Sequence, residues 1–218
     1  SRVKANTTTG FSIVSWVGDS TSAGKTIGHG LADAPDFIIF KNRDDASDWP
    51  VYHTSLGTDY AVYLNTTGAQ DDRGVGFLNS TAPSSSLITL HTWNLNNGTG
   101  DDMIAYCWAE KAGYSSFGSY TGNGSSVSVT TGFLPAFILI KRYNTSAAAT
   151  NWEIHDNTRN TAGELLGVLY PNTSGTEGFN NSGSSITTNS TSFTVNGSGG
   201  SINGNNDTYI YAAFADTR

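Results

Sequence analysis

Cysteine, charge and long apolar runs are all scarce in this sequence, and each shortage excludes a class of protein. Because Cys107 is the only cysteine, no disulfide can form within the chain, which excludes a disulfide-stabilised scaffold. Charged residues make up 13% of the chain, the formal net charge is −7, and there is no run of basic residues. Such a chain cannot neutralise a row of phosphates, so nucleic acid is not an expected partner. No stretch of about 18 apolar residues occurs, so membrane insertion is not expected either.

The rest of the composition favours short β-strands joined by many turns. Glycine, serine, threonine and asparagine alternate with short apolar runs, a mixture typical of strands and turns rather than of helices. A chain of 218 residues can bury the core of one large domain or two small ones. Its first residues, SRVKANTTTG, lack the apolar segment of a signal peptide. This extended polar start favours a piece of a longer protein.

Five segments recur in the same order about one hundred residues further along the chain. Collinear matches at a nearly constant offset predict two related units from an internal duplication, residues 1–110 and 111–218. The paired segments are SIVSWVGD with SFGSYTGN, APDFIIFKNR with LPAFILIKRY, DWPVYH with NWEIHD, YLNTTG with YPNTSG, and MIAYCWAE with YIYAAFAD.

Each unit is predicted to be all-β. In MIAYCWA, large and small side chains alternate with period two, so Met103, Ala105 and Cys107 share one face of a strand. On that face Cys107 is expected to be a small buried core residue. The runs DFIIFK and AFILIK are apolar throughout, which indicates central strands of a sheet. We therefore predict two tandem β-sandwich units of jelly-roll-like architecture.

The stretch GDSTSAGKT looks like a phosphate-binding loop but fails its requirements. A P-loop has four residues between its two glycines, whereas five separate Gly18 from Gly24. Asp19 would bring a negative charge towards the phosphates. A P-loop also opens a helix, and the TIGHGLADAP that follows is rich in helix-breaking residues. We interpret the stretch as a flexible loop.

Three loops that match poorly between the two units are the predicted binding surface, residues 44–49, 71–76 and 91–102. Trp93 has no clear counterpart in the second unit, whereas Trp49 corresponds to Trp152. An unmatched aromatic beside a polar loop is a candidate for stacking on a sugar ring. The candidate ligand-binding residues are Trp93, His91, Asp101, Asp102, Asp44 and Asp45.

The acidic clusters also have a simpler interpretation as solvated loops. NLNNGTGDD offers oxygen ligands and leaves Ca²⁺ open as a cofactor, although it lacks the spacing of an EF-hand. No other cofactor and no metal site is expected. The histidines lack metal-binding spacing, there is no G-x-S-x-G motif, and the acids form no obvious catalytic pair. The sequence therefore predicts a protein that is not an enzyme.

Asparagine-x-serine/threonine triplets are unusually frequent. They are either glycan acceptors of a secreted protein or a by-product of turns rich in asparagine, serine and threonine, and we favour the second interpretation. The candidate acceptors are Asn65, Asn79, Asn144, Asn172 and Asn189.

Four stretches together resemble a known family: GFSIVSWVGDSTSAGKTIGHGLADAPDFIIFKNR with WPVYHTSLG, MIAYCWAEKAGYSSFGSYTGNG, TGFLPAFILIKR and TYIYAAFAD. They are similar to a repeated β domain of marine, cyanophage-like bacteriophage structural proteins, such as tail fibres. This resemblance covers nearly the whole chain. It implies a non-enzymatic module with a virion or extracellular location, and it supplies no binding residues.

Several functions stay open on this basis. The first is a tail-fibre module that contributes to attachment to host-surface glycans. The second is a purely structural subunit of an extracellular fibre, filament or capsid decoration, glycosylated if its triplets are used. A polysaccharide depolymerase would need paired acids in a groove. The expected partners are other virion or fibre subunits, with the chain as a homo-oligomer, and host glycan.

Overall fold

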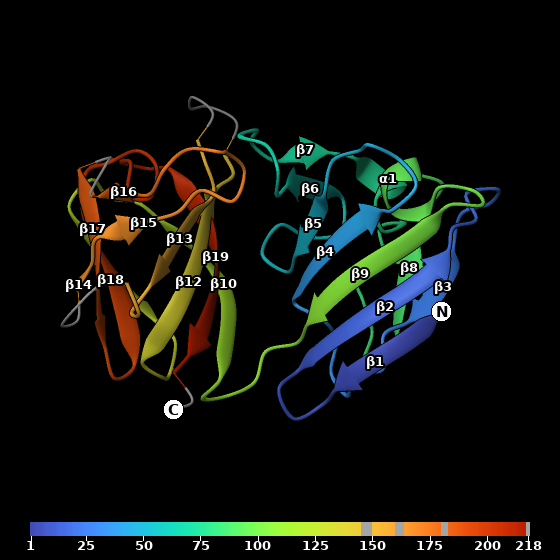
Figure 1. The fold of residues 1–218 in the computed structure, drawn as a ribbon, viewed down its shortest axis with the longest axis horizontal. Coiled ribbons are helices and arrows are strands. Elements are labelled where there is room, and N and C mark those ends of the chain that lie inside the picture. The colour runs from blue at the N-terminus through green and yellow to red at the C-terminus, as the bar shows by residue number, and fades with distance from the viewer. Residues whose placement is uncertain (145–149, 160–163, 180–182, 217–218) are drawn as a thin grey trace. The chain divides into compact units, whose positions relative to one another are not determined.

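Antiparallel β-sheets make up both units of the chain (Figure 1). The computed structural model describes residues 1–144, 150–159, 164–179 and 183–216. Unit 1 comprises Ser1–Asn65 and Gln70–Lys111, and unit 2 comprises Thr66–Ala69 and Ala112–Arg218. The predicted all-β class is confirmed, because strands dominate the described residues.

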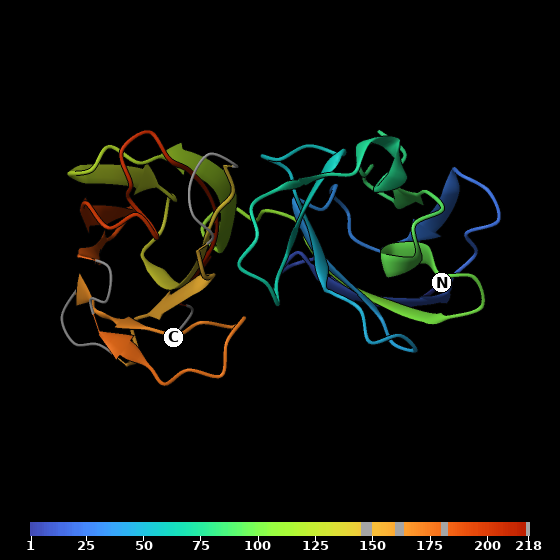
Figure 2. The ribbon, with the colours of Figure 1, turned by 90° about the horizontal axis from the view of Figure 1, so that it is seen from above.

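A seven-stranded sheet in the order β1-β2-β9-β4-β5-β6-β7 forms one layer of unit 1. Its inner face contributes Phe40 and Met103 to a core that Ile88 and Leu90 of the small β3-β8 sheet cover. The helical turns α1 and η1 lie on the same side of the large sheet as β3 (Figure 2). The elements are β1 (Arg2–Asn6), β2 (Phe11–Val17), β3 (Lys25–Gly28), β4 (Phe37–Asn42), β5 (Pro50–His53), β6 (Tyr60–Tyr63), β7 (Asp71–Asp72), η1 (Gly74–Gly76), β8 (Leu87–Leu90), α1 (Asn94–Asn97) and β9 (Asp102–Trp108).

Two four-stranded sheets pack face to face in unit 2, in the orders β10-β19-β12-β13 and β11-β18-β17-β14. Ile138 and Tyr209 of the first sheet share one core with Ile186 and Phe193 of the second, which is the layering of a β-sandwich. The elements are β10 (Ser115–Thr121), β11 (Ser126–Thr130), β12 (Pro135–Arg142), β13 (Glu153–Asp156), β14 (Glu164–Leu165), β15 (Gly167–Val168), β16 (Gly178–Phe179), β17 (Ser184–Asn189), β18 (Ser192–Gly197) and β19 (Thr208–Ala215).

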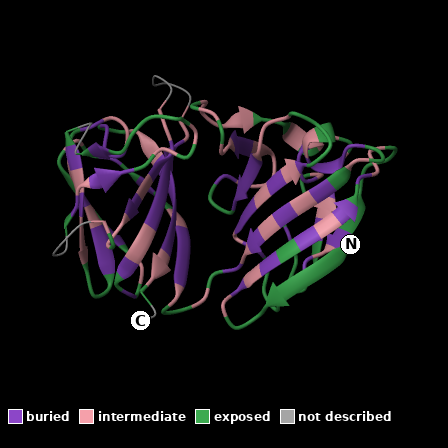
Figure 3. Cartoon of the chain, viewed as in Figure 1, coloured by how far each residue is buried: buried purple, intermediate pink, exposed green. Residues whose placement is uncertain are grey.

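Burial follows the alternation expected from the sequence. Along β9, Met103, Ala105 and Cys107 are fully buried, and the residues between them are half-buried (Figure 3). The two apolar runs lie in β4 and β12, each of which has a strand on both sides, so their prediction as central strands is confirmed. The expectation that such runs are buried on both faces is met only in part, because Ile39 and Phe137 are half-buried. β1 is different, because all five of its residues are exposed at the edge of the sheet.

The two units share the order and the register of four strands. β2-β9-β4-β5 in unit 1 has the same chain order and connections as β10-β19-β12-β13 in unit 2. Phe37 of β4 lies opposite Trp108 of β9, and Phe137 of β12 lies opposite Phe214 of β19. On the other side of β9, Phe11 of β2 lies opposite Trp108. In unit 2, Ser115 of β10 likewise lies opposite Phe214 of β19.

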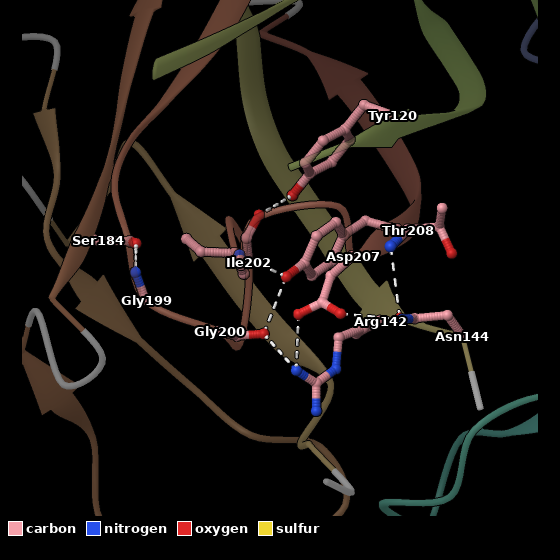
Figure 4. Close-up of polar contacts among 11 residues, drawn as sticks. Tyr120, Arg142, Asn144, Ser184, Gly199, Gly200, Ile202, Asp207 and Thr208 are labelled. Carbon is pink, nitrogen blue, oxygen red and sulfur yellow. Dashed lines mark hydrogen bonds and ion pairs between the residues drawn. The ribbon is translucent and has the colours of Figure 1, made fainter. Parts of the chain in front are cut away.

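A loop of sequence Asn-Gly-x-x-Asp leads into the last strand of unit 2, and we call residues 203–207 the Asn-Gly corner of this unit (Figure 4). Asp207 accepts a hydrogen bond from Arg142 at 3.0 Å through Oδ2 and one from Asn144 Nδ2 at 2.9 Å through Oδ1. Arg142 also donates to the carbonyl of Gly200 at 3.0 Å. The corner therefore ties the end of β12 to the start of β19.

Residues 97–101 form the same corner in unit 1, with a neutral donor in place of the arginine. Asn42 Nδ2 donates to Asp101 Oδ2 at 2.7 Å and to the carbonyl of Asn94 at 3.2 Å. Asn97 Oδ1 accepts from the backbone of Asp19 at 2.9 Å, as Asn203 Oδ1 accepts from Asn123 at 3.0 Å.

Glycine is required at the second position of both corners. A Cβ on Gly98 would lie 2.2 Å from the Asp101 carboxylate, and one on Gly204 would lie 2.1 Å from that of Asp207. No side chain fits at that distance, so the close approach of backbone and carboxylate explains both glycines.

Cys107 should be inert in the folded protein. Burial raises the pKa of its thiol to about 12, with a hydrogen bond from Ser12 acting weakly in the other direction. Because the thiolate is the reactive species, we expect negligible reaction with a disulfide reagent at pH 8 and rapid reaction after unfolding in urea. Fast labelling of the native protein would contradict the buried position.

The corners should differ in how much stability their aspartates supply. Asp207→Asn leaves the buried Arg142 without a counter-charge and should cost about 3 kcal/mol in the free energy of unfolding. The matched variant Asp101→Asn faces only the amide of Asn42 and should cost about 1 kcal/mol. Equilibrium urea unfolding of both variants measures the difference. Equal losses would show that the ion pair adds nothing to the corner.

Candidate functional site

Two of the three loops expected to bind a ligand meet beside α1 in unit 1. Trp93 immediately precedes this helical turn, and its carbonyl accepts the backbone N–H of Asn97 at 2.8 Å. The guanidinium of Arg73, from the 71–76 loop, lies over the Trp93 ring with its central carbon 4.4 Å from the ring centroid. We call Trp93, Arg73, Tyr63, Asp71 and Phe77 the Trp93 cluster.

Trp93 is half-buried, and its edges rest on the core of unit 1. The rings of Phe77 and Tyr63 meet it edge to face, with centroids 5.6 and 6.3 Å away. The prediction that Trp93 offers an aromatic surface is compatible with this position, because the core holds the ring in place without covering it completely.

Asp71 fixes the cation of the Trp93 cluster. Its Oδ2 lies 3.1 Å from Arg73 and accepts the Tyr63 hydroxyl at 2.5 Å. Burial, followed by the adjacent Asp71 carboxylate, raises the pKa of Tyr63, so this hydroxyl stays protonated and continues to donate. Arg73 lies in the predicted 71–76 loop but is not among the candidate residues, and Tyr63 lies outside all three predicted loops, because neither contact with Trp93 is visible from the sequence.

The turn after Asp72 adds an exposed apolar side chain to this surface. Asp72 Oδ1 accepts the backbone N–H of Gly74, and Gly74 takes a φ of 50° that favours glycine. Val75 then projects with 57% of its surface exposed. The loop therefore has an exposed apolar side chain two residues after the arginine that lies over the Trp93 ring.

The four acidic candidates gather around Asn42 rather than around Trp93. Asn42 Oδ1 accepts the backbone N–H groups of Asp44 and Asp45, and its Nδ2 donates to Asp101. Asp44 Oδ2 accepts the N–H of Asp102 at 2.6 Å. These bonds make Asp101 and Asp44 structural acceptors. The exposed Asp102 carboxylate lies 3.5 Å from the Arg43 guanidinium, and Asp45 is exposed to solvent.

Two hydrogen bonds of His91 lie within its own loop. Its Nδ1 lies 3.1 Å from the Thr92 hydroxyl, and its carbonyl accepts the side chain of Asn97 at 2.8 Å. Within residues 1–144, 150–159, 164–179 and 183–216, no three His, Cys, Asp or Glu side chains converge to hold a metal ion.

Unit 2 has no aromatic residue at the position of Trp93. Asn203 donates to the carbonyl of Gly199 at 2.8 Å, the bond that Asn97 makes with Trp93. Gly199 therefore stands in the place of Trp93. The aromatic ring is an addition of unit 1 to a corner that both units have.

The GDSTSAGKT stretch is a turn that leads into a strand. Lys25 begins β3 and pairs with Asp19 at 2.9 Å. Hydrogen bonds from Thr21, followed by the contact with Lys25, lower the pKa of Asp19 to about 2. With a strand where a P-loop requires a helix, and with its lysine already paired, the stretch lacks the geometry of a phosphate site.

Four of the five candidate glycan acceptors use their amide nitrogen in the fold. Asn65 donates to Asp48 and Asn172 to Asn151. Asn189 donates to Ser192, and Asn144 donates to Asp207 in the corner of unit 2. Each of these amide nitrogens already has a place in a turn or loop contact, which favours their interpretation as turn residues. Asn79 differs, because it occupies a positive φ of 54°.

The fold and this surface define an all-β, two-unit module with an aromatic and cationic cluster on its loops. The chain belongs to the family described as Domain of unknown function (DUF7483), whose model matches residues 1–217. A search of curated proteins found no match. The described part of the chain contains no helix of the length and apolarity needed to cross a membrane.

Nucleotide should not bind to the Asp19–Lys25 turn. Titration of Mg²⁺-ATP into the protein should produce no binding heat and no change in thermal stability. A micromolar affinity that disappears in Lys25→Ala would overturn this interpretation, and Lys4→Ala is the control for a general loss of positive charge.

Proposed function

We propose that this chain is a non-enzymatic β-module of a virion or extracellular fibre that contributes to attachment to a surface glycan. The Trp93 cluster carries this proposal. It combines a fixed, half-exposed aromatic ring with a charged pair and an apolar loop tip. Its partners are a host glycan and the other subunits of the fibre.

The proposal includes an origin by tandem duplication of one sandwich unit. It is supported by the common strand order, by the common register at Phe37 and Phe137, and by the Asn-Gly corner in both units. Corresponding hydrogen bonds in the two Asn-Gly corners, about one hundred residues apart along the chain, are difficult to explain by amino-acid composition alone.

A sugar ring suits the Trp93 cluster because it has an apolar C–H face and a polar edge. The face stacks on an aromatic ring, and the edge bonds to groups such as the Arg73 guanidinium and the Asp71 carboxylate. One stacked ring contributes on the order of 1 kcal/mol, so a single module binds weakly. Multiple copies in a fibre would supply the avidity.

A purely structural subunit is the second candidate function, and β1 is the observation that favours it. All five residues of β1 are exposed, and β1 is the outer strand of the seven-stranded sheet. An edge strand presents unpaired backbone groups to another chain, so β1 suits the addition of a strand from a second subunit.

Trp93→Ala should weaken glycan binding. Loss of one stacked ring predicts a roughly fivefold lower affinity of the single module on a glycan array, and a larger loss in adsorption of the multivalent assembly. Trp93→Phe retains an aromatic face and should keep most of the binding.

The matched control is Trp108→Ala. This variant removes another half-buried tryptophan, the last residue of β9, which lies outside the Trp93 cluster. Circular dichroism must show that both alanine variants are folded. Unchanged adsorption in Trp93→Ala would refute the glycan role of the Trp93 cluster, and the structural subunit would then be the better proposal.

A further inference from the structure

Unit 2 contains a surface hollow of about 570 Å³ that belongs to none of the sites described above. Its volume lies in the range of about 300–1,000 Å³ typical of small-molecule sites. It lies where β12 begins, β13 ends and β19 ends. The lining residues are Ala136, Phe137, Asp156, Asn157, Thr158, Arg159, Leu169, Ala215 and Asp216.

The floor of the hollow is apolar and includes one aromatic ring. Phe137 is half-buried on β12, and its ring centroid lies 5.9 Å from that of Phe214 on the neighbouring strand. Ala136 and Ala215 are small, and Leu169 has 38% of its surface exposed. A flat apolar face of a ligand therefore has a surface to rest on.

The turn after β13 forms a polar rim that is fixed before any ligand arrives. Asp156 Oδ1 accepts the backbone N–H groups of Thr158 and Arg159, and its Oδ2 accepts Arg159 Nε at 2.6 Å. Burial alone would raise the pKa of Asp156, but the hydrogen bonds from Arg159 and Thr158 outweigh it and lower the pKa. A prearranged rim reduces the entropy cost of binding.

The positive charge at this rim is already balanced. Arg159 pairs with Asp156 and with Glu177 at 2.5 Å, and it also donates to the carbonyl of Ile154. Asp216 adds a further carboxylate to the lining. Arg159 is the only cation among the lining residues, so an anionic ligand would meet net negative charge.

Two neutral side chains of the rim are free to bind. Asn157 and Thr158 line the hollow, and within the described ranges of the chain their side chains form no hydrogen bond. The amide both donates and accepts, and so does the hydroxyl, which is the combination that pairs with the hydroxyl groups of a sugar.

The same turn in unit 1 shows how the hollow opens. The N–H of Thr54 bonds to the carbonyl of Asp36, as that of Asn157 bonds to the carbonyl of Ala136. The Asp36 carboxylate then accepts the N–H of Glu110 at 2.8 Å, across the space beside the strand. Ala136 has no such side chain, so this space is left open in unit 2.

We propose that this hollow is a second ligand site that takes a neutral pyranose, with the apolar face of the sugar on Phe137 and its hydroxyl groups on Asn157 and Thr158. The site goes beyond the proposed function, because it uses no residue of the Trp93 cluster. It gives the chain two different sugar-binding surfaces, one in each unit.

The test is a titration of the full chain followed by amide NMR. The probes are the methyl glycosides of glucose, galactose and N-acetylglucosamine, with galacturonate as the anionic control and choline as the cationic control. At least one neutral glycoside should produce saturable shifts at Asn157, Thr158 and Ala215, in the wild type and equally in Trp93→Ala. Failure of Trp93 in glycan attachment would therefore leave this result unaffected.

Two variants give the proposal its sharp outcomes. The double variant Asn157→Ala and Thr158→Ala retains the Asp156 turn and should weaken the shifts about tenfold. Ala136→Asp places in the hollow the carboxylate that Asp36 has in unit 1, and it should abolish the shifts. Asn205→Ala changes an exposed asparagine elsewhere in unit 2 and should leave the shifts unchanged. Absence of saturable shifts with all three neutral glycosides would overturn the proposal. A response to choline or galacturonate alone would overturn it equally.

Discussion

A half-buried carboxylate at the Asn-Gly corner, held by a buried donor, is the constraint on which the rest of each unit depends. In unit 2, Asp207 holds Arg142 and Asn144 at the end of β12, and Asn144 in turn accepts the N–H of Thr208 at the start of β19. The last strand must enter between the first strand and β12, and these bonds fix where it enters. Taking the Arg142 guanidinium or the Asn42 amide out of water is costly unless it is hydrogen-bonded, so each buried donor needs the corner carboxylate as its acceptor. That requirement explains why it recurs in unit 1 with the same glycine and a different donor, Asn42.

The corner also determines where a binding surface can arise. α1 begins one residue after Trp93, and the carbonyl of Asn94 in that turn is held by Asn42. The position of Trp93 is thus set by bonds that do not involve its own side chain, and unit 2 has Gly199 there without loss of the corner. The backbone of the corner therefore does not depend on the Trp93 ring, although the ring also packs on Phe77 and the core of unit 1.

The strands are predictable from the sequence because their signal is local. Alternation around Cys107 and the apolar runs beginning at Phe37 and Phe137 identify faces and central strands without knowledge of any partner. The corner was readable in part, since Asn-Gly-x-x-Asp occurs before the last strand of both units. The donors of the corner could not be predicted from the sequence, because Asn42 and Arg142 come from a neighbouring strand that is distant along the chain. The same limit explains the acidic candidates: Asp101 looks like a ligand-binding residue in a polar loop, and only the fold shows that it is a structural acceptor.

At two places the two units have the same backbone hydrogen bonds but different side chains above them. Trp93 and Gly199 differ above one shared corner, and Asp36 and Ala136 differ above one shared turn, while the backbone bonds at both places are the same. The Asp36 carboxylate accepts the N–H of Glu110, and Ala136 has no side chain that could do so. If both proposed ligand sites exist, each depends on one side chain above a turn whose backbone bonds the two units share. Because a fixed turn does not have to be ordered when a ligand arrives, less of the contact free energy there is lost on binding than at a flexible loop.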